Sequence, residues 1–538
     1  MPHARRRAGW ALASCVALLV AGAPTALAAQ GAGATAFAAG KAVSVHTAAN
    51  GAKRIKYRIG PFEVKPGQNE IGYRVIGERP QVDGYFTRIR PDLTYLDGTV
   101  PGVDVIHLHH GVWLNVGRRD ATAPFVPERF FATGEEKTLM RLPRVYGYPV
   151  KAKDGLVLNH MIHNLTPVPT KVWMVYEVDF VPARSAAGRR LRPVRPIWMD
   201  VQNGSAYPVF NVPKAAGSAG RYTYPDDATD PYHGGPKLNE WVVDRPGVLV
   251  STAGHLHPGG LHTDLYLRRR GASIRPARCG SRPTPALRAR CRRTAPRGSG
   301  NRVHLFRSNA RYYEPAGAVS WDVSMTASRP NWRVKLRKGD VLSVTATYDT
   351  SRAAWWESMG INDLTYMAYD GPGVNPFKRR VDLRGAVTHP HLPENNQHGG
   401  GPTSMPDPRV LPDGAVNPGV VPLVDFKYRL GDLSLPAPDG LPPVIAPGQT
   451  LTFRDAGDNA RAAYHSITSC KAPCNRSTGI AYPIADGDVQ FESGTLGTAN
   501  PPATGALEWT TPSDLGPGTY TYFCRIHPFM RGAFRVKQ

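Results

Sequence analysis

One short segment near the end of the chain combines three residue types that bind soft metals. Within CRIHPFMRG, Cys524, His527 and Met530 are separated by two residues each. A thiolate, an imidazole and a weak thioether from one loop supply most of a type 1 (blue) copper site, which needs one further histidine. His465, in AAYHSIT, is the only other histidine between residue 419 and the end of the sequence. These four residues predict a type 1 copper centre that transfers single electrons.

Cysteine usage supports this interpretation. In an oxidising compartment cysteines that are close in sequence tend to pair. This predicts disulfides between Cys279 and Cys291 and between Cys470 and Cys474. Cys524 is then left over, and an odd cysteine in an exported protein is expected to have a chemical role.

The elements that position these residues are predicted to be strands. Alternating runs such as KVWMVYEVDF and DVLSVTATYD recur along the chain, and 55 glycines and 51 prolines favour short elements joined by turns. The ligand segment itself lies between the strand-like runs TYTYF and AFRV. We therefore predict an all-β protein whose metal-binding loop joins two strands near the chain end.

The N-terminus is typical of an export signal. ARRRAGW is followed by the apolar ALASCVALLVAG and by a small-residue cleavage site at Ala26–Ala28. Cys15 would be removed with this signal. Three consecutive arginines leave the Sec and twin-arginine routes both open. The predicted location is therefore secreted or associated with the cell envelope, and no other segment has a transmembrane composition.

The net charge of +24 comes largely from an arginine-rich stretch within residues 266–302. A nucleic-acid-binding surface would interleave aromatic residues with the basic ones, within a recognisable module. This stretch has neither feature, so no specific nucleic-acid partner is expected. A basic surface loop of an exported protein is instead expected to make loose contact with anionic envelope polymers.

Three further groups of histidines lie on or beside strand-like runs. They occur in VDVIHLHHGVWLN, LVLNHMIHNLTP and STAGHLHPGGLHTDL, and comprise His107, His109, His110, His160, His163, His255, His257 and His262. Residues i and i+2 share a face of a strand, so each His-x-His pair can chelate one metal. The adjacent pair His109–His110 can converge only at a bulge. Imidazole clusters of this kind bind copper, zinc or iron.

Two family resemblances follow from these motifs. Residues 419–538 resemble a cupredoxin, because YTYFCRIHPFMRGAFRV is similar to the ligand loop of amicyanin and its relatives, and VIAPGQTLTFRDAGDNARAAYHSI to their early strands. This resemblance implies a Greek-key sandwich and electron transfer through an exposed edge of His527. The Cys470/Cys474 loop departs from the family pattern.

Residues 55–375 distantly resemble the type 2 copper, ascorbate-dependent monooxygenases, such as peptidylglycine alpha-hydroxylating monooxygenase and dopamine beta-monooxygenase. RLPRVYGYPV, LVLNHMIHN, GHLHPGGLHTDLYLRRRG, LRKGDVLSVTATYDTS and WESMGINDLTYMAY follow one another in the family's order. The resemblance implies two jelly-roll-like lobes, two type 2 coppers, and hydroxylation of a C–H bond with O₂.

The resemblance also implies ligand sets. The first copper would be held by His109, His110 and His163, with His160 as the alternative third ligand. The second, oxygen-binding copper would be held by His255, His257 and Met359, with Met367 as the alternative thioether. His107 and His262 have no assigned place and are expected beside the ligands. The catalytic residues predicted in this way are Met359, His255 and His257.

One departure bears on the substrate. The peptide-amidating member of the family has an arginine before its His-x-His and a tyrosine after its methionine. The matching stretches here, STAGHLH and SMGIND, contain neither. Peptide amidation is therefore not expected, and the substrate, small or peptide-like, is left unassigned.

The predicted organisation is a signal peptide (1–28), an N-terminal linker (29–54), two monooxygenase-like lobes (55–195 and 196–375), a Pro/Gly-rich linker (376–418) and a cupredoxin domain (419–538). We expect the cupredoxin to supply electrons to the lobes, in cis or through a reductant or partner protein. The linker histidines are interpreted as ordinary linker residues, namely His389, His391 and His398. The alternative is a non-enzymatic copper-binding or electron-transfer protein whose lobes are a silent scaffold.

Overall fold

The computed structural model describes most of the chain after the predicted signal. The described residues are 40–48, 51–67, 71–205, 207–274, 284–287, 289, 295–313, 317–394, 405–457, 464–474, 484, 487–497 and 506–538. The predicted signal peptide, the Cys279–Cys291 disulfide and His398 lie outside them. By their contacts, residues Ala39–Gln538 form one unit. No described helix is long and apolar enough to cross a membrane.

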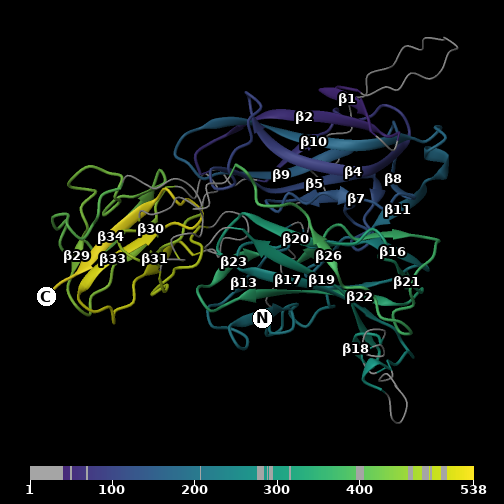
Figure 1. Ribbon diagram of the computed structural model, residues 1–538. Coiled ribbons are helices and arrows are strands. Elements are labelled where there is room, and N and C mark those ends of the chain that lie inside the picture. Colours follow the sequence, from purple (N-terminus) through teal and green to yellow (C-terminus); the bar gives the residue numbers. More distant parts are fainter. Residues whose placement is uncertain are drawn as a thin grey trace, which may run out of the picture. The chain divides into compact units, whose positions relative to one another are not determined.

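The prediction of an all-β fold is confirmed (Figure 1). The longest sheet has the strand order β1-β2-β10-β4-β8-β11-β25-β16-β21, with β7 paired to β4. Its strands are β1 (Ser44–Thr47), β2 (Lys53–Val64), β10 (Thr170–Pro182), β4 (Gly84–Tyr95), β7 (Met140–Arg141), β8 (Tyr146–Val150), β11 (Arg192–Pro196), β25 (Tyr366–Ala368), β16 (Gly247–Ser251) and β21 (Val334–Leu336). A 3-10 turn, η1 (Gly188–Arg190), precedes β11.

A four-stranded sheet, ordered β3-β9-β5-β6, packs on this long sheet to form the first sandwich. It consists of β3 (Ile71–Val75), β9 (Leu156–Asn164), β5 (Ile106–Arg119) and β6 (Pro127–Thr133). The buried ring of Trp113 on β5 lies 5.8 Å from that of Tyr176 on β10, which in turn stacks on Tyr57 of β2. These aromatic contacts join the two layers, because burying such rings removes a large apolar area from water.

The second sandwich is built around an eight-stranded sheet ordered β14-β22-β17-β19-β20-β26, with β15 beside β22 and β18 beside β19. Its strands are β14 (Arg221–Tyr224), β15 (Glu240–Val242), β17 (Gly260–Arg268), β18 (Gly298–Ser299), β19 (Arg302–Tyr312), β20 (Val323–Ser328), β22 (Val341–Asp349) and β26 (Gly385–Val387). Leu265, Leu305 and Val344 of this sheet share one buried core with Leu249 and Leu336 of the long sheet. Two short ladders complete the region, β12 (Met199–Asp200) with β24 (Ile361–Asn362) and β13 (Phe210–Val212) with β23 (Trp355–Ser358).

Two segments predicted to be linkers contribute to these sheets. β1 belongs to the predicted N-terminal linker and pairs with β2, and β26 belongs to the predicted Pro/Gly-rich linker and pairs with β20. Farther along the latter, His389 Nε2 lies 3.0 Å from the Val323 carbonyl, and the His391 ring pairs with the buried carboxylate of Asp322. Residues 385–391 therefore pack on the second sandwich.

A buried ion-pair cluster ties β17 to β19. The carboxylate of Asp264 lies 3.0 Å from His262 Nδ1, 2.7 Å from His304 Nε2 and 2.7 Å from Arg307 Nε. Burial alone raises the pKa of Asp264, but these three partners hold the pKa well below its ordinary value. The carboxylate therefore stabilises the fold above its unfolded-state pKa, and that stabilisation is lost as the pH falls through the lower folded-state pKa.

Asp264→Asn is expected to lower the free energy of unfolding at neutral pH by about 3 kcal/mol, because it removes the charge of a buried carboxylate that pairs with three partly exposed side chains. The difference from the parent protein should shrink below about pH 4, where the unfolded-state carboxyl becomes protonated. Urea unfolding at several pH values measures both. The control is Asp382→Asn, which breaks the exposed pair with Arg384 and should cost less than about 1 kcal/mol. Equal effects of the two variants would contradict the prediction.

The C-terminal sandwich has two four-stranded sheets, ordered β28-β27-β30-β32 and β29-β34-β33-β31. Their strands are β27 (Val420–Val424), β28 (Lys427–Tyr428), β29 (Val444–Ile445), β30 (Thr452–Asp455), β31 (Thr468–Cys470), β32 (Glu508–Thr510), β33 (Gly518–Phe523) and β34 (Arg531–Val536). Val421 and Phe453 of the first sheet share a core with Tyr522 and Phe534 of the second. The predicted disulfide Cys470–Cys474 is confirmed at the end of β31.

Candidate metal centres

The C-terminal ligand loop connects two antiparallel strands. β33 ends at Phe523 and β34 begins at Arg531, so Cys524 to Met530 form the connection. Two backbone hydrogen bonds close the loop: Cys524 N–H donates to the Met530 carbonyl at 3.1 Å, and Met530 N–H donates to the His527 carbonyl at 2.8 Å. The side chains of Cys524, His527 and Met530 are fully buried.

His465 joins this loop from a separate segment. It forms an isolated bridge with Leu496, which fixes its backbone just before β31. Its Nδ1 lies 3.2 Å from Nδ1 of His527, and the Sγ of Cys524 lies 3.7 Å from the same His527 atom. One ligand atom from each of these three residues lies within 4.8 Å of the other two. This spacing suits three ligands of one metal ion, and the donor set of two imidazoles and a thiolate favours copper.

The surroundings of the Cys524 sulfur favour its ligand form. Backbone N–H groups of Ser466 and His527 each donate to Sγ at 3.3 Å. Burial by itself raises the pKa of the Cys524 thiol, but the hydrogen bonds and charges of His465 and His527 hold the pKa well below its ordinary value. The thiolate is the form of cysteine that binds metals.

His527 is oriented by its second nitrogen. Its Nε2–H donates to the Gly67 carbonyl at 2.8 Å, which leaves Nδ1 free to face Cys524 and His465. The ring of Phe426 packs edge-on against it, with 4.8 Å between centroids. The sequence-based expectation of an exposed His527 edge is wrong, because a backbone segment from the first sandwich covers that edge.

The lobes bring most of their predicted histidines into one buried cluster. β5 and β9 pair so that His107 lies opposite His163, and the register shifts between Leu108 and His110. The bulge that the adjacent histidines require is therefore present. Ring centroids of His107 and His109 lie 4.7 and 4.5 Å from that of His163, and His109 lies 4.5 Å from His257 of the second sandwich.

The backbone segments that carry His255, His257 and Met359 lie side by side in a short ladder. His255 N–H donates to the Ile361 carbonyl at 2.8 Å, so the His-x-His segment runs beside the segment of Met359. The buried hydroxyl of Tyr348 accepts from His257 N–H at 3.2 Å and from Met359 N–H at 3.0 Å, and donates to the Met359 carbonyl at 2.7 Å. One tyrosine thus fixes both predicted ligand segments. Met367, the alternative thioether, lies on β25 in the main core.

Several cluster imidazoles have buried nitrogens without a hydrogen-bond partner, namely His107 Nε2, both ring nitrogens of His163, and His257 Nε2. Burial lowers the pKa of His107 to about 3 and, with neighbouring histidines, holds the pKa values of His163 and His257 well below the ordinary value. A buried polar atom without a hydrogen-bond partner is costly. A metal ion bound by the free nitrogens of these neutral imidazoles would remove that cost. In donor chemistry the residues present therefore fit a bound metal, whereas their ligand atoms do not show the close spacing of the C-terminal set.

The remaining predicted ligands have other partners. His110 Nε2 lies 2.7 Å from the Asn159 side-chain oxygen, and His160 packs against Phe62 with 4.4 Å between ring centroids. Of the two alternatives on β9, it is therefore His163 that lies in the cluster. His255 Nδ1 pairs with the buried Glu136 carboxylate at 2.8 Å. A carboxylate on one ring nitrogen commonly orients the other nitrogen toward a metal.

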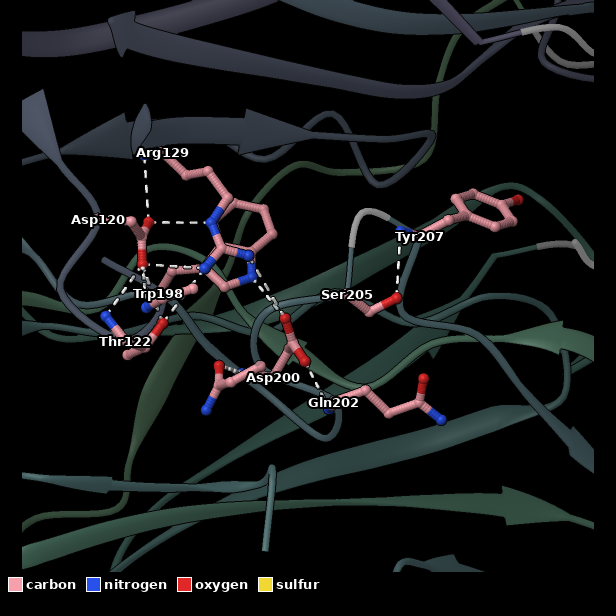
Figure 2. Close-up of polar contacts among 10 residues, drawn as sticks. Asp120, Thr122, Arg129, Trp198, Asp200, Gln202, Ser205 and Tyr207 are labelled. Carbon is pink, nitrogen blue, oxygen red and sulfur yellow. Dashed lines mark hydrogen bonds and ion pairs between the residues drawn. The ribbon is translucent and has the colours of Figure 1, made fainter. Parts of the chain in front are cut away.

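A polar network surrounds Trp198 (Figure 2). Arg129 on β6 pairs with Asp120 at 2.9 Å, and its guanidinium lies 4.6 Å from the ring centre of Trp198. Trp198 Nε1 donates to Asp200 at 2.8 Å. Trp198 belongs to the same apolar cluster as Met359, so this network holds one member of that cluster in place.

Sequence reasoning missed several residues of these centres. Glu136, Tyr348, Trp321 and Gly67 carry no motif, and each lies far along the chain from the ligand that it contacts. Trp321 packs 4.6 Å from the ring of His107. In the sequence, only their residue types could have indicated a role, since Glu136 and Trp321 stand among strand-like segments without a recognisable motif.

No family model matches the chain, and no curated protein matches it. Solved structures that show similarity include three with a TM-score of 0.14 each. The Cu(I) form of a mutant amicyanin is 20% identical and the match covers 25% of this chain and 92% of that one. A purple cupredoxin from Nitrosopumilus maritimus is 18% identical, with coverage of 22% and 99%. A copper-containing nitrite reductase from Thermus scotoductus SA-01 is 15% identical, with coverage of 55% and 59%, so this chain spans less than two thirds of it.

The C-terminal region is cupredoxin-like in its ligand set and in the place of its ligand loop between two strands. At these TM-scores the assignment of the metal centre rests on its own geometry, namely the convergence of His465, Cys524 and His527.

Proposed function

We propose that the chain is an exported copper protein in which the C-terminal sandwich carries single electrons and the lobes hold further copper. The observation that supports this most directly is the buried set of His465, Cys524 and His527, with Met530 in the same loop and with the pKa of the Cys524 thiol held well below its ordinary value by the two histidines. Copper bound there would supply fast one-electron exchange. The protein contributes a rigid, water-excluding loop closed by its own hydrogen bonds.

For the lobes we propose a monooxygenase-like reaction, in which copper supplies the activation of O₂ for hydroxylation of a C–H bond. His255, His257 and Met359 would form the oxygen-binding site, and His109 and His163, with His107 or His110, the electron-storing site. Tyr348 holds the first set in register, and Glu136 orients His255. A reductant or redox protein outside the cell would supply the electrons that reduce the copper of the C-terminal centre.

One observation favours the non-enzymatic alternative. Among the described residues, only His465, Cys524 and His527 place three ligand atoms within 4.8 Å of one another. The lobe histidines are clustered by their rings but do not meet this spacing. In the alternative the lobes would be a scaffold, and the protein would bind copper or transfer electrons without a reaction of its own.

Copper counting combined with paramagnetic resonance separates the two proposals. The protein without its predicted signal peptide is loaded with copper, and unbound copper is then removed. We expect one blue-type signal together with type 2 signals and more than one copper per chain, because His107, His163 and His257 have buried ring nitrogens without a hydrogen-bond partner and lowered pKa values. A single blue copper would leave the lobes as a scaffold. Absence of any blue signal would contradict both proposals.

A further inference from the structure

The solvent edge of the type 1 histidine is closed by a backbone segment of the same chain. Gly67 lies in the turn that follows β2, with a φ of +63°. Its carbonyl accepts the His527 Nε2–H at 2.8 Å, across 460 residues of sequence. His527 is fully buried. A redox protein in solution therefore has no direct access to this imidazole.

Gly67 is also hydrogen-bonded to the first sandwich. Its N–H donates to the Asn164 carbonyl at 3.0 Å, and Asn164 is the last residue of β9. The preceding residue is His163, whose ring packs against those of His107 and His109. Two hydrogen bonds and a few covalent bonds thus connect the His527 imidazole with the lobe histidine cluster.

A second contact fixes this arrangement on the other side of the loop. Arg525, next to Cys524, donates from Nη1 to the Ala354 carbonyl at 2.6 Å. Its guanidinium lies 4.8 Å and 4.5 Å from the ring centres of Trp355 and Trp356. Arg525 also pairs with Glu492 at 3.4 Å, and Glu492 accepts from Ala354 N–H at 2.8 Å. Buried charge and aromatic contact of this kind hold a defined geometry.

We propose that Gly67 is the electron port between the C-terminal sandwich and the lobes, so that the redox partner of the type 1 centre is the histidine cluster around His163 in the same chain. The inference rests on the proposed function and adds the route. With copper held by His465, Cys524 and His527 and a second copper held by the lobe histidines, one electron would pass from the first centre, oxidised from Cu(I) to Cu(II), to the second, reduced from Cu(II) to Cu(I). No proton moves, because His527 keeps its Nε2–H bonded to Gly67 throughout.

Gly67→Ala tests the contact directly. A Cβ at this position would lie 2.7 Å from His527 Cδ2 and 2.7 Å from Phe426 Cε1, so the ring must move away from the carbonyl. The matched control is Gly448→Ala, which has a similar φ of +82° but nothing within 4 Å of the added carbon. Both variants carry the same backbone cost of about 1–2 kcal/mol for a left-handed alanine, and only one disturbs His527.

The first readout needs no metal. In the ¹⁵N-labelled apo protein, the His527 Nε2–H resonance, assigned by its loss in His527→Gln, should exchange slowly with water. Gly67→Ala should accelerate this exchange by about tenfold or more, the factor expected for one lost hydrogen bond. Gly448→Ala should leave it unchanged. A rapidly exchanging resonance in the parent protein would overturn the proposed port.

The second readout uses the copper-loaded full chain. A substoichiometric pulse of a small reducing radical bleaches the blue colour, and recovery of the colour reports the electron leaving the type 1 centre. We expect recovery at a rate independent of protein concentration, severalfold slower in Gly67→Ala and unchanged in Gly448→Ala. Recovery proportional to protein concentration, or unaffected by Gly67→Ala, would overturn the port while leaving the blue centre in place. Absence of blue colour would instead overturn the proposed function.

Discussion

Copper-loaded Cys524→Ser protein is expected to lose the intense visible absorption entirely. That absorption requires a thiolate bound to copper, and Cys524 is the only free cysteine among the described residues. Serine is close in size and can accept the N–H groups of Ser466 and His527 that now point at sulfur. The fold should therefore persist while the colour disappears, as measured by absorption spectra and circular dichroism of the same sample.

Met530→Leu is the matched control for the colour. The thioether of a type 1 site is a weak, long ligand that tunes the potential, whereas the thiolate produces the colour. Met530→Leu also conserves volume in a buried position, and such exchanges usually cost less than about 1.5 kcal/mol. We expect it to stay blue with a shifted reduction potential. Persistent colour in Cys524→Ser would refute the type 1 assignment, whatever the control shows.

Met359→Leu should abolish O₂ consumption driven by a reductant while the blue colour is retained. The exchange removes the proposed thioether ligand, and leucine retains an apolar side chain of similar volume in the cluster that contains Trp198. We expect a loss of at least about a hundredfold, because even changes in groups that merely orient a ligand cost about 10–100-fold. An oxygen electrode measures the rate, and absorption of the same sample shows that the C-terminal centre is intact.

Met367→Leu distinguishes the two thioethers that the sequence leaves open. Met367 is fully buried on β25, opposite Leu249 and Arg195 in the sheet, and belongs to the main core. Its exchange for leucine should leave O₂ consumption within a small factor of the parent rate. If turnover survives Met359→Leu and fails in Met367→Leu, the assignment of the oxygen-binding site is wrong.

The C-terminal centre is the more predictable one because three of its four proposed ligands come from one short loop. The spacing of Cys524, His527 and Met530 is set locally by the turn between two strands, and His465 was the only histidine left to complete the set. What the sequence could not show was the burial of His527. Its hydrogen bond to Gly67 spans most of the chain, and no residue pattern near Gly67 indicates it.

In the lobes, strand periodicity predicted part of the arrangement. His107 and His109 share a face of β5, and the bulge beside His110 was recognised as a requirement of the adjacent pair. Periodicity could not decide between His160 and His163, because the choice depends on where β3 and β5 pair with β9. Glu136 and Tyr348, the buried partners of the ligands, lie on segments that only tertiary packing brings next to His255 and His257.

The disulfide between Cys470 and Cys474 has a consequence for how the protein is assembled. This bridge ends the strand that pairs with β33, and β33 delivers Cys524. During maturation three thiols therefore emerge in one small region, and only one of the three ways to pair them leaves the metal-binding sulfur reduced. Copper that arrives before oxidation would occupy Cys524 and remove it from thiol exchange. We therefore expect the yield of correctly bridged, copper-binding protein to depend on the order of metal insertion and oxidation.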